Sequence, residues 1–419
     1  MTKNSKIDDL SFDVLIVGGG LAGATLALML GQKGIQTAVI ERFPLSLQRQ
    51  RSFDHRTTAL AAGTIRILRS IGVWEHVAPT SCPITHIEIL DGPRLLSEWP
   101  VLVDFKSSDV EGDAFGYIAD NMDLRASLFD ALSLCSFITL FAPTDITSIE
   151  TDTDRTSVTL NDGRILSASL LVGADGRGSY VRDYFRVPVR GWPYGHTAII
   201  CSVHHTGDHK NIAIEHFNAH GPFAVLPMTD DENGLHRSGI VWSMPPAEAR
   251  KVMAMDDDTF ATALSSRMPD RYGDITVHAP RAAYPLTLQH ALRYTGPRMV
   301  LVADAAHGIH PIAGQGLNLG MRDLADLADL LIPAHQNGQD LGAPDLLEQY
   351  ERIRRRDTIG MIGTTDILTG LFGLSIPGIP LIRRWGLRAV QAIPPLKRFF
   401  IQQAMGAELN TKSYAWDQR

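Results

Sequence analysis

The sequence predicts an α/β protein with two different β-sheets. Three features favour this class: a βαβ pattern at the chain start, a β-rich stretch from about 185 to 290, and a return to strand–loop–helix alternation after 291. Of the 419 residues, 44% are hydrophobic, which is enough for a large core shared by two or three lobes. The formal net charge of −7 gives no reason to expect nucleic acid as a partner.

The cellular setting follows from the cysteines and the N-terminus. Cys82, Cys135 and Cys201 are far apart and match neither a CxxC pair nor a disulfide framework. We therefore expect them to be reduced, buried thiols, as in a cytosolic protein. The first 13 residues are polar and include acids, so no signal peptide is expected. The uncharged run 14–30 is nearly long enough to span a bilayer, but its glycines indicate strand, turn and helix. We therefore expect a cytoplasmic protein without a transmembrane segment.

The first motif is Gly-rich. A β-type run over 12–17 is followed by GGGLAG and then by an apolar stretch that stops at Gly34. Within it, Gly18, Gly20 and Gly23 form G-x-G-x-x-G between the expected strand and helix. The first glycine allows a tight turn, the second brings the backbone near a pyrophosphate, and the third lets helix and strand pack closely. Alone the pattern is weak, because ordinary Gly-rich turns also match it.

Glu41 adds weight to this motif. It stands 18 residues after Gly23, at the end of a second expected strand over 35–41. A carboxylate at that place can accept hydrogen bonds from ribose hydroxyls, and it would repel a 2′-phosphate. The unit therefore predicts a Rossmann-type dinucleotide site other than an NADP site, with the helix N-terminus facing the anion.

The middle of the chain predicts a second sheet. A helix is expected over 59–71, with Gly72 as its stop, and a β-hairpin is expected around 161–163 (Asn-Asp-Gly). Between about 185 and 290 four β-type runs predict an antiparallel sheet inserted into the first lobe. Four residues there are candidates for a pocket, although a sheet core explains them equally well: Phe217, Phe223, Leu226 and Trp242.

Residues 302–323, VADAAHGIHPIAGQGLNLGMRD, concentrate acidic, histidine and glycine residues between two apolar runs. A metal site is not expected, because no cysteine or HExxH motif completes a ligand set with His307 and His310. A nucleophilic hydrolase is not expected either, because the stretch has no GxSxG. Both histidines are then better explained as structural or pocket-lining residues.

A cofactor cradle fits the same stretch better. Asp304 ends an expected strand, where it can accept hydrogen bonds from polyol hydroxyls. Gly314 and Gly316 let the loop backbone come close to a flat ligand, and a helix beginning near 317–318 directs its N–H groups at negative charge. Further upstream, Asp175 follows a strand in LLVGADGRGSYVR, a segment that a plain strand and turn would also explain.

Taken in order, these motifs carry a resemblance. GxGxxG with a strand-end Glu, GADG at 173–176, and DAAH…P…GQG-x-N at 304–318 resemble the single-component FAD-dependent aromatic hydroxylases of the para-hydroxybenzoate hydroxylase fold. The resemblance covers about 12–360. The stretch 52–74, together with AIEHF and GPFAVLP, is similar to the subgroup that hydroxylates the ring of ubiquinone precursors.

Two positions depart from what is usual in that subgroup, and both concern the substrate side. His196 stands where a Gln is common, and His216 stands where an Arg often occurs.

The resemblance implies an FAD-dependent hydroxylase that uses NAD(P)H and O2 on a polyprenylated phenol. It implies that arginines flank the pyrophosphate and flavin, that Asp304 binds the ribityl chain, and that the 316–318 backbone meets the flavin pyrimidine edge. It also links Asp175 to FAD and pyridine-nucleotide handling, and it implies neither a catalytic side chain nor a metal. The implied cofactor-binding residues are Gly18, Gly20, Gly23, Glu41, Arg56, Arg125, Asp175, Asp304, Gly316, Leu317 and Asn318.

The expected organisation is discontinuous, and two other functions remain open. One is hydroxylation of another hydrophobic aromatic, and the other is a non-catalytic FAD-binding role in a quinone-synthesis assembly. The expected segments are an FAD-binding lobe over 1–77, 106–184 and 291–360, a substrate sheet over 78–105 and 185–290, and a C-terminal helical part over 361–419.

The C-terminal part predicts a membrane surface as a partner. No acidic residue occurs between Asp366 and Glu408, and basic residues alternate there with apolar ones. Prolines break the stretch into pieces too short to cross a bilayer. We expect peripheral attachment on the inner face of the membrane, with a helical cap on the FAD-binding lobe as the alternative. The basic residues are Arg383, Arg384, Arg388, Lys397 and Arg398.

Overall fold

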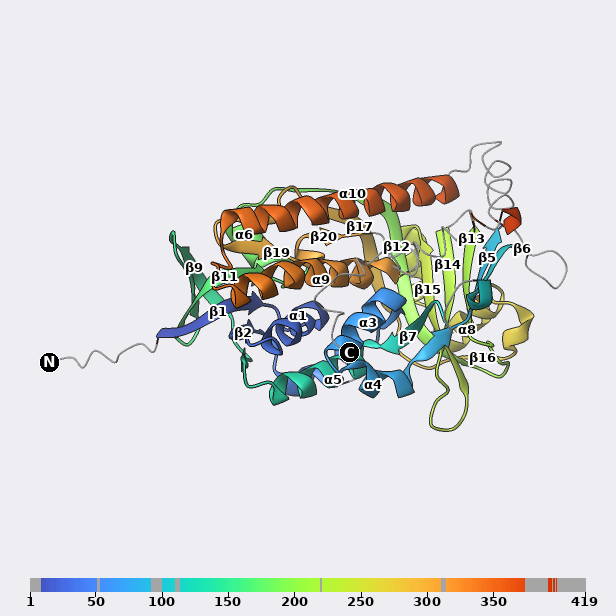
Figure 1. Cartoon of the computed structure of the whole chain (residues 1–419). Coiled ribbons are helices and arrows are strands. Elements are labelled where there is room, and N and C mark those ends of the chain that lie inside the picture. Colours follow the sequence, from blue (N-terminus) through green and yellow to red (C-terminus); the bar gives the residue numbers. More distant parts are fainter. Residues whose placement is uncertain are drawn as a thin grey trace.

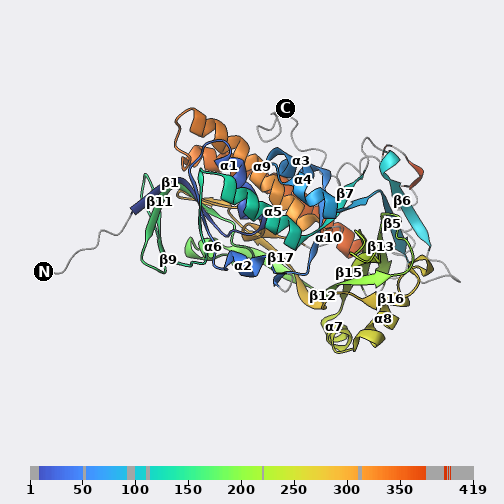
Figure 2. The same cartoon turned by 90° about the horizontal axis from the view of Figure 1, so that it is seen from below.

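Two sheets lie beside each other, and most helices gather around the first of them (Figures 1 and 2). The structure is a computed structural model. It describes residues 9–50, 53–91, 100–109, 114–218, 221–309 and 314–373, together with 391–393, 395 and 397.

The first sheet has eight strands in the described residues, and its centre is parallel. Val14, Leu15 and Ile16 are fully buried, as expected for a central strand that is covered on both faces. The predicted hairpin is confirmed, with Gly163 at φ +88° in its turn. In spatial order the main strands are β18 (Thr295–Gly296), β19 (Met299–Leu301), β11 (Ile165–Gly173), β1 (Asp9–Val17), β2 (Thr37–Ile40) and β8 (Ile138–Phe141); β10 (Thr156–Leu160) and β9 (Ile146–Thr151) extend β11.

The helices cover this sheet and connect its strands. The Gly-rich turn leads into α1, which packs against α5 and α9. The helix bounds are α1 (Leu21–Gly31), α2 (Leu45–Gln48), α3 (Ala62–Ser70), α4 (Trp74–Val77), α5 (Asn121–Leu134), α6 (Tyr180–Tyr184), α9 (Gln315–Gln336) and α10 (Pro344–Gly373).

The prediction of a helix over 59–71 is wrong for its first three residues, and the helix α3 begins at Ala62. Residues 57–61 form β3 (Thr57–Ala61), which pairs with β7 (Gly116–Asp120), and β7 also pairs with β4 (Cys82–Ile84). The long-range partner β7 satisfies the backbone of this segment, and no local pattern reveals that partner.

The second sheet has nine strands in the described residues and is antiparallel except for one pair. β13 and β5 run parallel, because β5 belongs to the separate segment before residue 106 and enters the sheet from the first lobe. In order the strands are β20 (His307–Gly308), β17 (Ala282–Ala291), β12 (Val189–His205), β15 (His236–Met244), β14 (Gly221–Met228), β13 (Ile212–Asn218), β5 (His86–Asp91) and β6 (Val101–Lys106), with β16 (Ile275–Val277) beside β12.

The two faces of this sheet have different neighbours. On the outer face, Ile199 packs with Phe260 under α7 (Pro246–Met253) and α8 (Asp257–Ser265). On the inner face, Ala213 packs with residues of the three-stranded sheet such as Ile118. The inner face is therefore the one that looks toward the first lobe.

The four candidate pocket residues separate between these faces. Phe223 and Trp242 are 0% and 5% exposed and belong to the outer core. Leu226 packs with the inner cluster, and Phe217 shares the inner side of β13 with Ala213. Only the last two can line a space between the lobes.

The predicted membrane segment lies largely outside the described residues. Of its five basic residues, Lys397 is described, and its Nζ lies 2.7 Å from Asp109 Oδ2 and near the ring of Phe105. Gln391 Oε1 accepts a hydrogen bond from the Asp104 N–H at 3.1 Å. This piece therefore lies against β6 of the second sheet. No helix in the described residues is long and apolar enough to cross a membrane.

Candidate cofactor and active site

The Gly-rich turn after β1 is built for a close backbone approach. A Cβ at Gly18, which has φ +101°, would lie 2.5 Å from Ala174 O, and a Cβ at Gly23 would lie 1.9 Å from Gly18 O. Neither position can hold a side chain without moving the backbone. Gly20 differs, because nothing lies within 4 Å of a Cβ built there. The free space in this turn is therefore on the side where Gly20 points.

The first turn of α1 is prepared for an anion. Gly20 is the N-cap, no side chain caps the helix, and its first turn contains no acidic residue. The first N–H groups of a helix have no partner within the helix and carry its positive dipole end. A phosphate group placed in the space beside Gly20 would satisfy them.

Glu41 holds the turn in place. Its side chain is buried, Oε2 accepts a hydrogen bond from the Gly19 N–H, and Oε1 accepts one from the Phe43 N–H, both at 2.8 Å. A carboxylate has about four acceptor sites, so both oxygens can still accept from ribose hydroxyls.

Arg56 and Arg125 meet at a buried carboxylate that the sequence analysis overlooked. Asp54 accepts hydrogen bonds from Arg56 Nε and Nη2, each at 2.8 Å, and from Arg125 Nη2 at 3.2 Å. Burial by itself raises the pKa of Asp54, but the Arg56 hydrogen bonds and charge outweigh it and hold the pKa well below its usual range. The two arginines are thus fixed beside each other by one ionised acid. The local sequence Asp-His-Arg contained a signal for the Arg56 contact, but the Arg125 contact joins residues 71 positions apart.

Arg125 keeps donors that no described residue satisfies. Its side chain is 7% exposed, and Nε and Nη1 are buried without a hydrogen-bond partner. Its guanidinium carbon lies 5.0 Å from the centre of the Phe53 ring. Buried donors without partners are costly, so this guanidinium fits a site for an anionic or carbonyl-bearing ligand.

Asp304 follows β19 in a short 3-10 turn and is exposed. Its charge acts on Arg56, and together with Asp54 it raises the pKa of that guanidinium, for which the Asp54 hydrogen bond is the largest cause. The preceding residue, Ala303, has φ +52°, and its N–H donates to Asp323 Oδ2 at 2.8 Å. A strained backbone held by a buried acid therefore fixes the turn that places the Asp304 charge near Arg56.

Asp175 lies on the other side of the Gly-rich turn. Oδ2 accepts from the Val181 N–H at 3.2 Å, whereas Oδ1 is buried and has no hydrogen-bond partner in the described part of the chain. Burial raises the pKa of Asp175 against the hydrogen bonds that lower it. A hydroxyl or amide donor from a ligand would satisfy the free oxygen.

The start of α9 offers a second set of helix N–H groups. Gly314 is its N-cap at φ +64°, and nothing lies within 4 Å of a Cβ built at Gly316. With the helix beginning at Gln315, the unpaired N–H groups include those of Gly316 and Leu317, while the N–H of Asn318 is placed for the first bond within the helix.

Asn318 contributes through its side chain. Oδ1 accepts from the Ala61 N–H and from Thr64 Oγ1, while Nδ2 donates to Ala59 O and Gly314 O. It fastens α9 to β3 and thereby fixes the loop next to Arg56.

His307 is a structural residue. Its Nε2 lies 2.7 Å from Asp323 Oδ2, and both side chains are buried; Asp323 Oδ1 accepts from Arg354 Nε at 2.7 Å. Burial raises the pKa of Asp323, and the charges of His307 and Arg354 overcome this and lower it. His310 lies outside the described residues, and no group of metal-ligand side chains occurs among the residues that are described.

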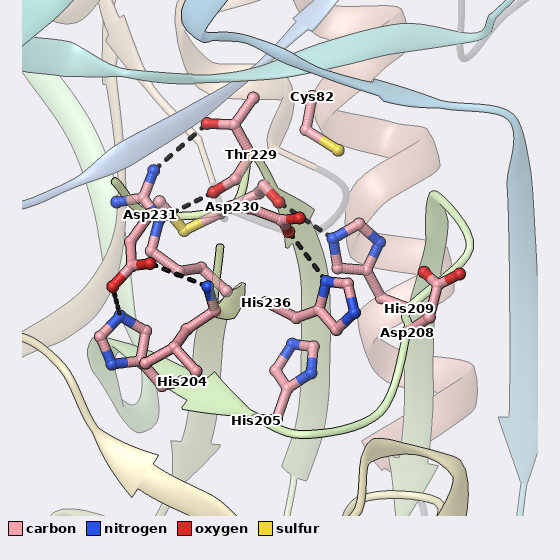
Figure 3. Close-up of polar contacts among 12 residues, drawn as sticks. Cys82, His204, His205, Asp208, His209, Thr229, Asp230, Asp231 and His236 are labelled. Atoms are coloured by element: carbon pink, nitrogen blue, oxygen red, sulfur yellow. Dashed lines mark hydrogen bonds and ion pairs between the residues drawn. The ribbon is translucent and has the colours of Figure 1, made fainter. Parts of the chain in front are cut away.

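A cluster of histidines lies at the edge of the second sheet where β12 and β14 end and β13 and β15 begin (Figure 3). The rings of His205, His209 and His236 are 5.8–6.0 Å apart. His236 Nδ1 lies 2.9 Å from Asp230 Oδ1, and His209 Nε2 donates to Met228 O while its Nδ1 accepts from the Asn211 N–H. Burial lowers the pKa of His205 and of His209. These contacts explain the cluster as histidines that tie two loops together, and burial favours the neutral form of His205 and His209.

The two departures from the usual sequence pattern lie away from the cradle. His196 lines a cavity of about 600 Å³ between α7, β12 and β17, on the outer side of the sheet. His216 is buried, and because its neighbours on β13 face inward, its own side chain faces the outer side of the sheet.

The predicted site residues therefore converge from several elements. Most follow the carboxyl ends of β1, β2, β11 and β19, which is where open parallel sheets bind ligands. Arg56 directly precedes β3, and α5 and the start of α9 supply the rest. The open space at Gly20, the uncapped helix starts and the unpartnered atoms of Arg125 and Asp175 all fit a dinucleotide with a polar ring system such as FAD.

Comparison with known proteins agrees with this geometry. The FAD binding domain family matches residues 11–362. The chain is 41% identical to the ubiquinone hydroxylase UbiL of Rhodospirillum rubrum over 94% of this chain and 89% of the relative. It is 32% identical to the 3-demethoxyubiquinol 3-hydroxylase of Escherichia coli over 94% of this chain and 98% of the relative.

A solved structure shares the fold. The p-nitrophenol 4-monooxygenase PnpA from Pseudomonas putida superposes with a TM-score of 0.79 at 17% identity, covering 94% of this chain and 98% of that one. The matched region 11–362 holds both the glycine turn and the start of α9, and this chain belongs to the FAD binding domain family.

Proposed function

We propose that this chain is an FAD-dependent monooxygenase that hydroxylates the aromatic ring of a polyprenylated ubiquinone precursor, with NAD(P)H and O2 as co-substrates. The observation that carries the proposal is the similarity to UbiL, a ubiquinone hydroxylase by name, along nearly the whole chain. It includes the second sheet, which carries the surface opposite the cradle, as well as the cofactor lobe.

The cofactor would be held by the residues that converge at the cradle. Gly18, Gly20 and Gly23 would admit the pyrophosphate to the start of α1, and Glu41 would bind the adenosine ribose. The arginines would face the pyrophosphate and flavin, Asp304 and Asp175 would accept from hydroxyl or amide donors, and the Gly316 and Leu317 N–H groups would meet the flavin ring. Asn318 would hold that loop against β3. Bound FAD supplies the redox chemistry, taking reducing equivalents from NAD(P)H and activating O2 for ring hydroxylation.

The protein's own task is positioning and exclusion of water. The inner face of the second sheet would carry the phenol ring, and its apolar lining, including Leu226 and Phe217, would keep solvent away from the reacting carbon. This chemistry needs neither a nucleophilic side chain nor a metal.

The proposal is tested with purified protein. It should be yellow, and heat should release FAD that chromatography identifies. The rate of NAD(P)H oxidation should then be measured in the presence of a prenylated phenol and, for comparison, of an unrelated aromatic. The mass of the product should be determined by mass spectrometry. A gain of one oxygen on the prenylated phenol supports the function. Release of NAD alone would overturn the flavin assignment, and bound FAD without any NAD(P)H oxidation on the tested phenols would leave the non-catalytic alternative.

We also propose that the protein works at a membrane surface, beside the other proteins of a quinone-synthesis assembly. The composition of 366–408 supports the membrane part, as does the expected substrate, whose polyprenyl tail lies in a bilayer.

A further inference from the structure

Glu215 is an acid in an unusual place. It lies on β13 between Ala213 and Phe217 and faces the same side as both, which is the inner face of the second sheet. Its neighbour Ile214 points the other way, into the outer core. Glu215 thus looks toward the lobe that carries the cofactor cradle.

Glu215 stands at one end of a row that crosses the sheet. The strand register pairs it with Ala224, and the row continues through Val241 and Ile200 to Ala282. Val241, Ile200 and Ala282 stay partly accessible, although the corresponding outer row of Ile214, Val225, Ile240 and Cys201 is buried. The described residues therefore leave this inner row partly uncovered.

The uncovered row lies opposite the cradle. In the row on one side of it, a Cβ built at Gly239 would lie 3.3 Å from Thr57 Oγ1. In the row on the other side, the ring of Tyr284 lies 5.8 Å from the guanidinium carbon of Arg56. The two contacts are made by adjacent residues, Thr57 at the start of β3 and Arg56 just before it. The row between them is an apolar strip with one charged group, Glu215, at its end.

Glu215 has no partner among the described residues. Its strand neighbours Ala224 and Ile89 are apolar, and no hydrogen bond or ion pair reaches its carboxylate. Burial raises its pKa to about 7, and no charged group contributes to that shift. Of the titratable groups that face the same space, Tyr284 and Arg56 stand at the far end of the strip. Arg237 lies on the inner face of β15, two residues before Gly239, and pairs with Asp120 at 3.8 Å. Glu88 of β5 lies on the outer face, where it binds Arg271. Glu215 is only partly accessible to solvent, so ionising it without a partner is costly, and a ligand donor would compensate that cost.

We propose that Glu215 is the residue that receives the phenol hydroxyl of the substrate and accepts its proton. This inference rests on the proposed function, because it supposes a phenol on the inner strip. The O–H bond of the phenol breaks, the proton passes to a carboxylate oxygen, and the electron pair stays on the phenol oxygen. The products are a phenolate and a neutral Glu215, with no change in oxidation state.

The transfer would serve the hydroxylation directly. A phenolate places more electron density on its ortho and para carbons than a phenol does, so these carbons accept oxygen more readily. The apolar strip of Val241 and Ile200 would carry the ring and leave Glu215 as the polar group that fixes its orientation.

The test measures binding to the FAD-loaded protein. The probes are 2-(3-methylbut-2-enyl)phenol and its methyl ether, which lacks the proton, and binding is followed by the change in flavin absorbance. Wild-type protein should prefer the phenol by about tenfold at pH 8, as expected for a hydrogen bond to a charged group. The preference should fall as the pH drops below 7, because only the ionised carboxylate accepts the proton.

Glu215→Gln should bind FAD normally and lose both the preference and its pH dependence. Glu232→Gln, which changes an exposed acid in the same lobe, is the matched control and should behave as wild type. A merely structural role of Glu215 would change the affinity for both probes equally and leave the pH profile of their ratio unaltered.

The outcomes separate this inference from the proposed function. A Glu215→Gln variant that keeps the wild-type preference and pH profile overturns the inference, whether or not the wild type hydroxylates phenols. A wild-type protein with no preference for the phenol over the ether overturns it as well. If the preference depends on Glu215 but no hydroxylated product forms with NAD(P)H and O2, the inference stands and the proposed reaction fails.

Discussion

Two glycines of the same turn should respond differently to a single methyl group. Gly20→Ala places Cβ in open space at φ −68°, so the free energy of unfolding of cofactor-free protein should change by less than about 1 kcal/mol. The methyl group would occupy the space assigned to the pyrophosphate, and FAD affinity should fall by about tenfold or more.

Gly23→Ala is the matched comparison. Its Cβ would lie 1.9 Å from Gly18 O, so α1 must move away from β1, and the cofactor-free protein should unfold at clearly lower urea concentration. Urea unfolding without FAD, combined with FAD titration, checks both variants. Equal loss of stability in the two would show that the space beside Gly20 is not reserved for a ligand.

Sequence reasoning at the residue scale succeeded where a backbone rule applies. The glycine turn and Glu41 were predictable, because a tight turn and a strand end each demand a particular residue type. Asp54 and Asp323 were missed, because their partners Arg125 and Arg354 are 71 and 31 positions away. Only the folded chain shows that one acid fixes two arginines.

At the scale of elements, a layer of polar side chains that includes His290, Tyr294 and Arg355 lies between β17 and α10. His290 Nε2 lies 2.9 Å from Tyr294 Oη, and burial, followed by the charges of His307, Arg355 and Arg190, lowers its pKa from 6.5 to about 4. The unfolded chain therefore binds a proton more readily between pH 6.5 and 4, and acid should destabilise the fold over that range.

The expected contribution of His290 is about 2 kcal/mol of lost stability on going from pH 7.5 to pH 5. His290→Gln, which keeps a polar group beside Tyr294, should reduce the pH dependence by that amount, whereas His76→Gln on the surface should not. Urea unfolding at the two pH values measures it. A variant with the same pH dependence as wild type would mean that His290 is not held neutral.

Helices and strands could be predicted where the local sequence pattern alone determines their structure. The β1–α1–β2 unit and the hairpin at Gly163 carry local signals, and both are present. β3 was read as helix, and the parallel pairing of β13 with β5 was not expected. In both cases the decisive partner is distant in sequence, β7 for one and a strand of the earlier segment for the other.

At the scale of the whole molecule, the chain passes repeatedly between two lobes. The loop after Asp175 is tied to the second sheet, since Arg177 donates to Thr287 O at 2.8 Å and Gln289 donates to Arg177 O at 2.8 Å. β20 follows Asp304 and pairs with β17. The cradle and the inner face of the second sheet are therefore held in a fixed relation, which a reaction between a cofactor and a ring requires.

The C-terminal basic segment should attach this molecule to an anionic bilayer. Lys397 is paired with Asp109, which leaves Arg383, Arg384, Arg388 and Arg398 as the basic residues assigned to lipid. Each basic group near an anionic surface is worth about 1 kcal/mol. Replacing Arg383, Arg384 and Arg388 together by Gln should therefore weaken binding by about 3 kcal/mol, or roughly 150-fold.

Flotation with liposomes of anionic and of neutral lipid measures this attachment. Wild-type protein should float with the anionic liposomes only, and the triple variant should stay behind while it still binds FAD. Lys397→Gln removes one positive charge from the same segment but breaks the Asp109 pair, so it serves as the control and should float as wild type does. If the triple variant floats equally well, or if Lys397→Gln abolishes flotation, the arginines are not the anchor, and the segment acts as a cover for β6.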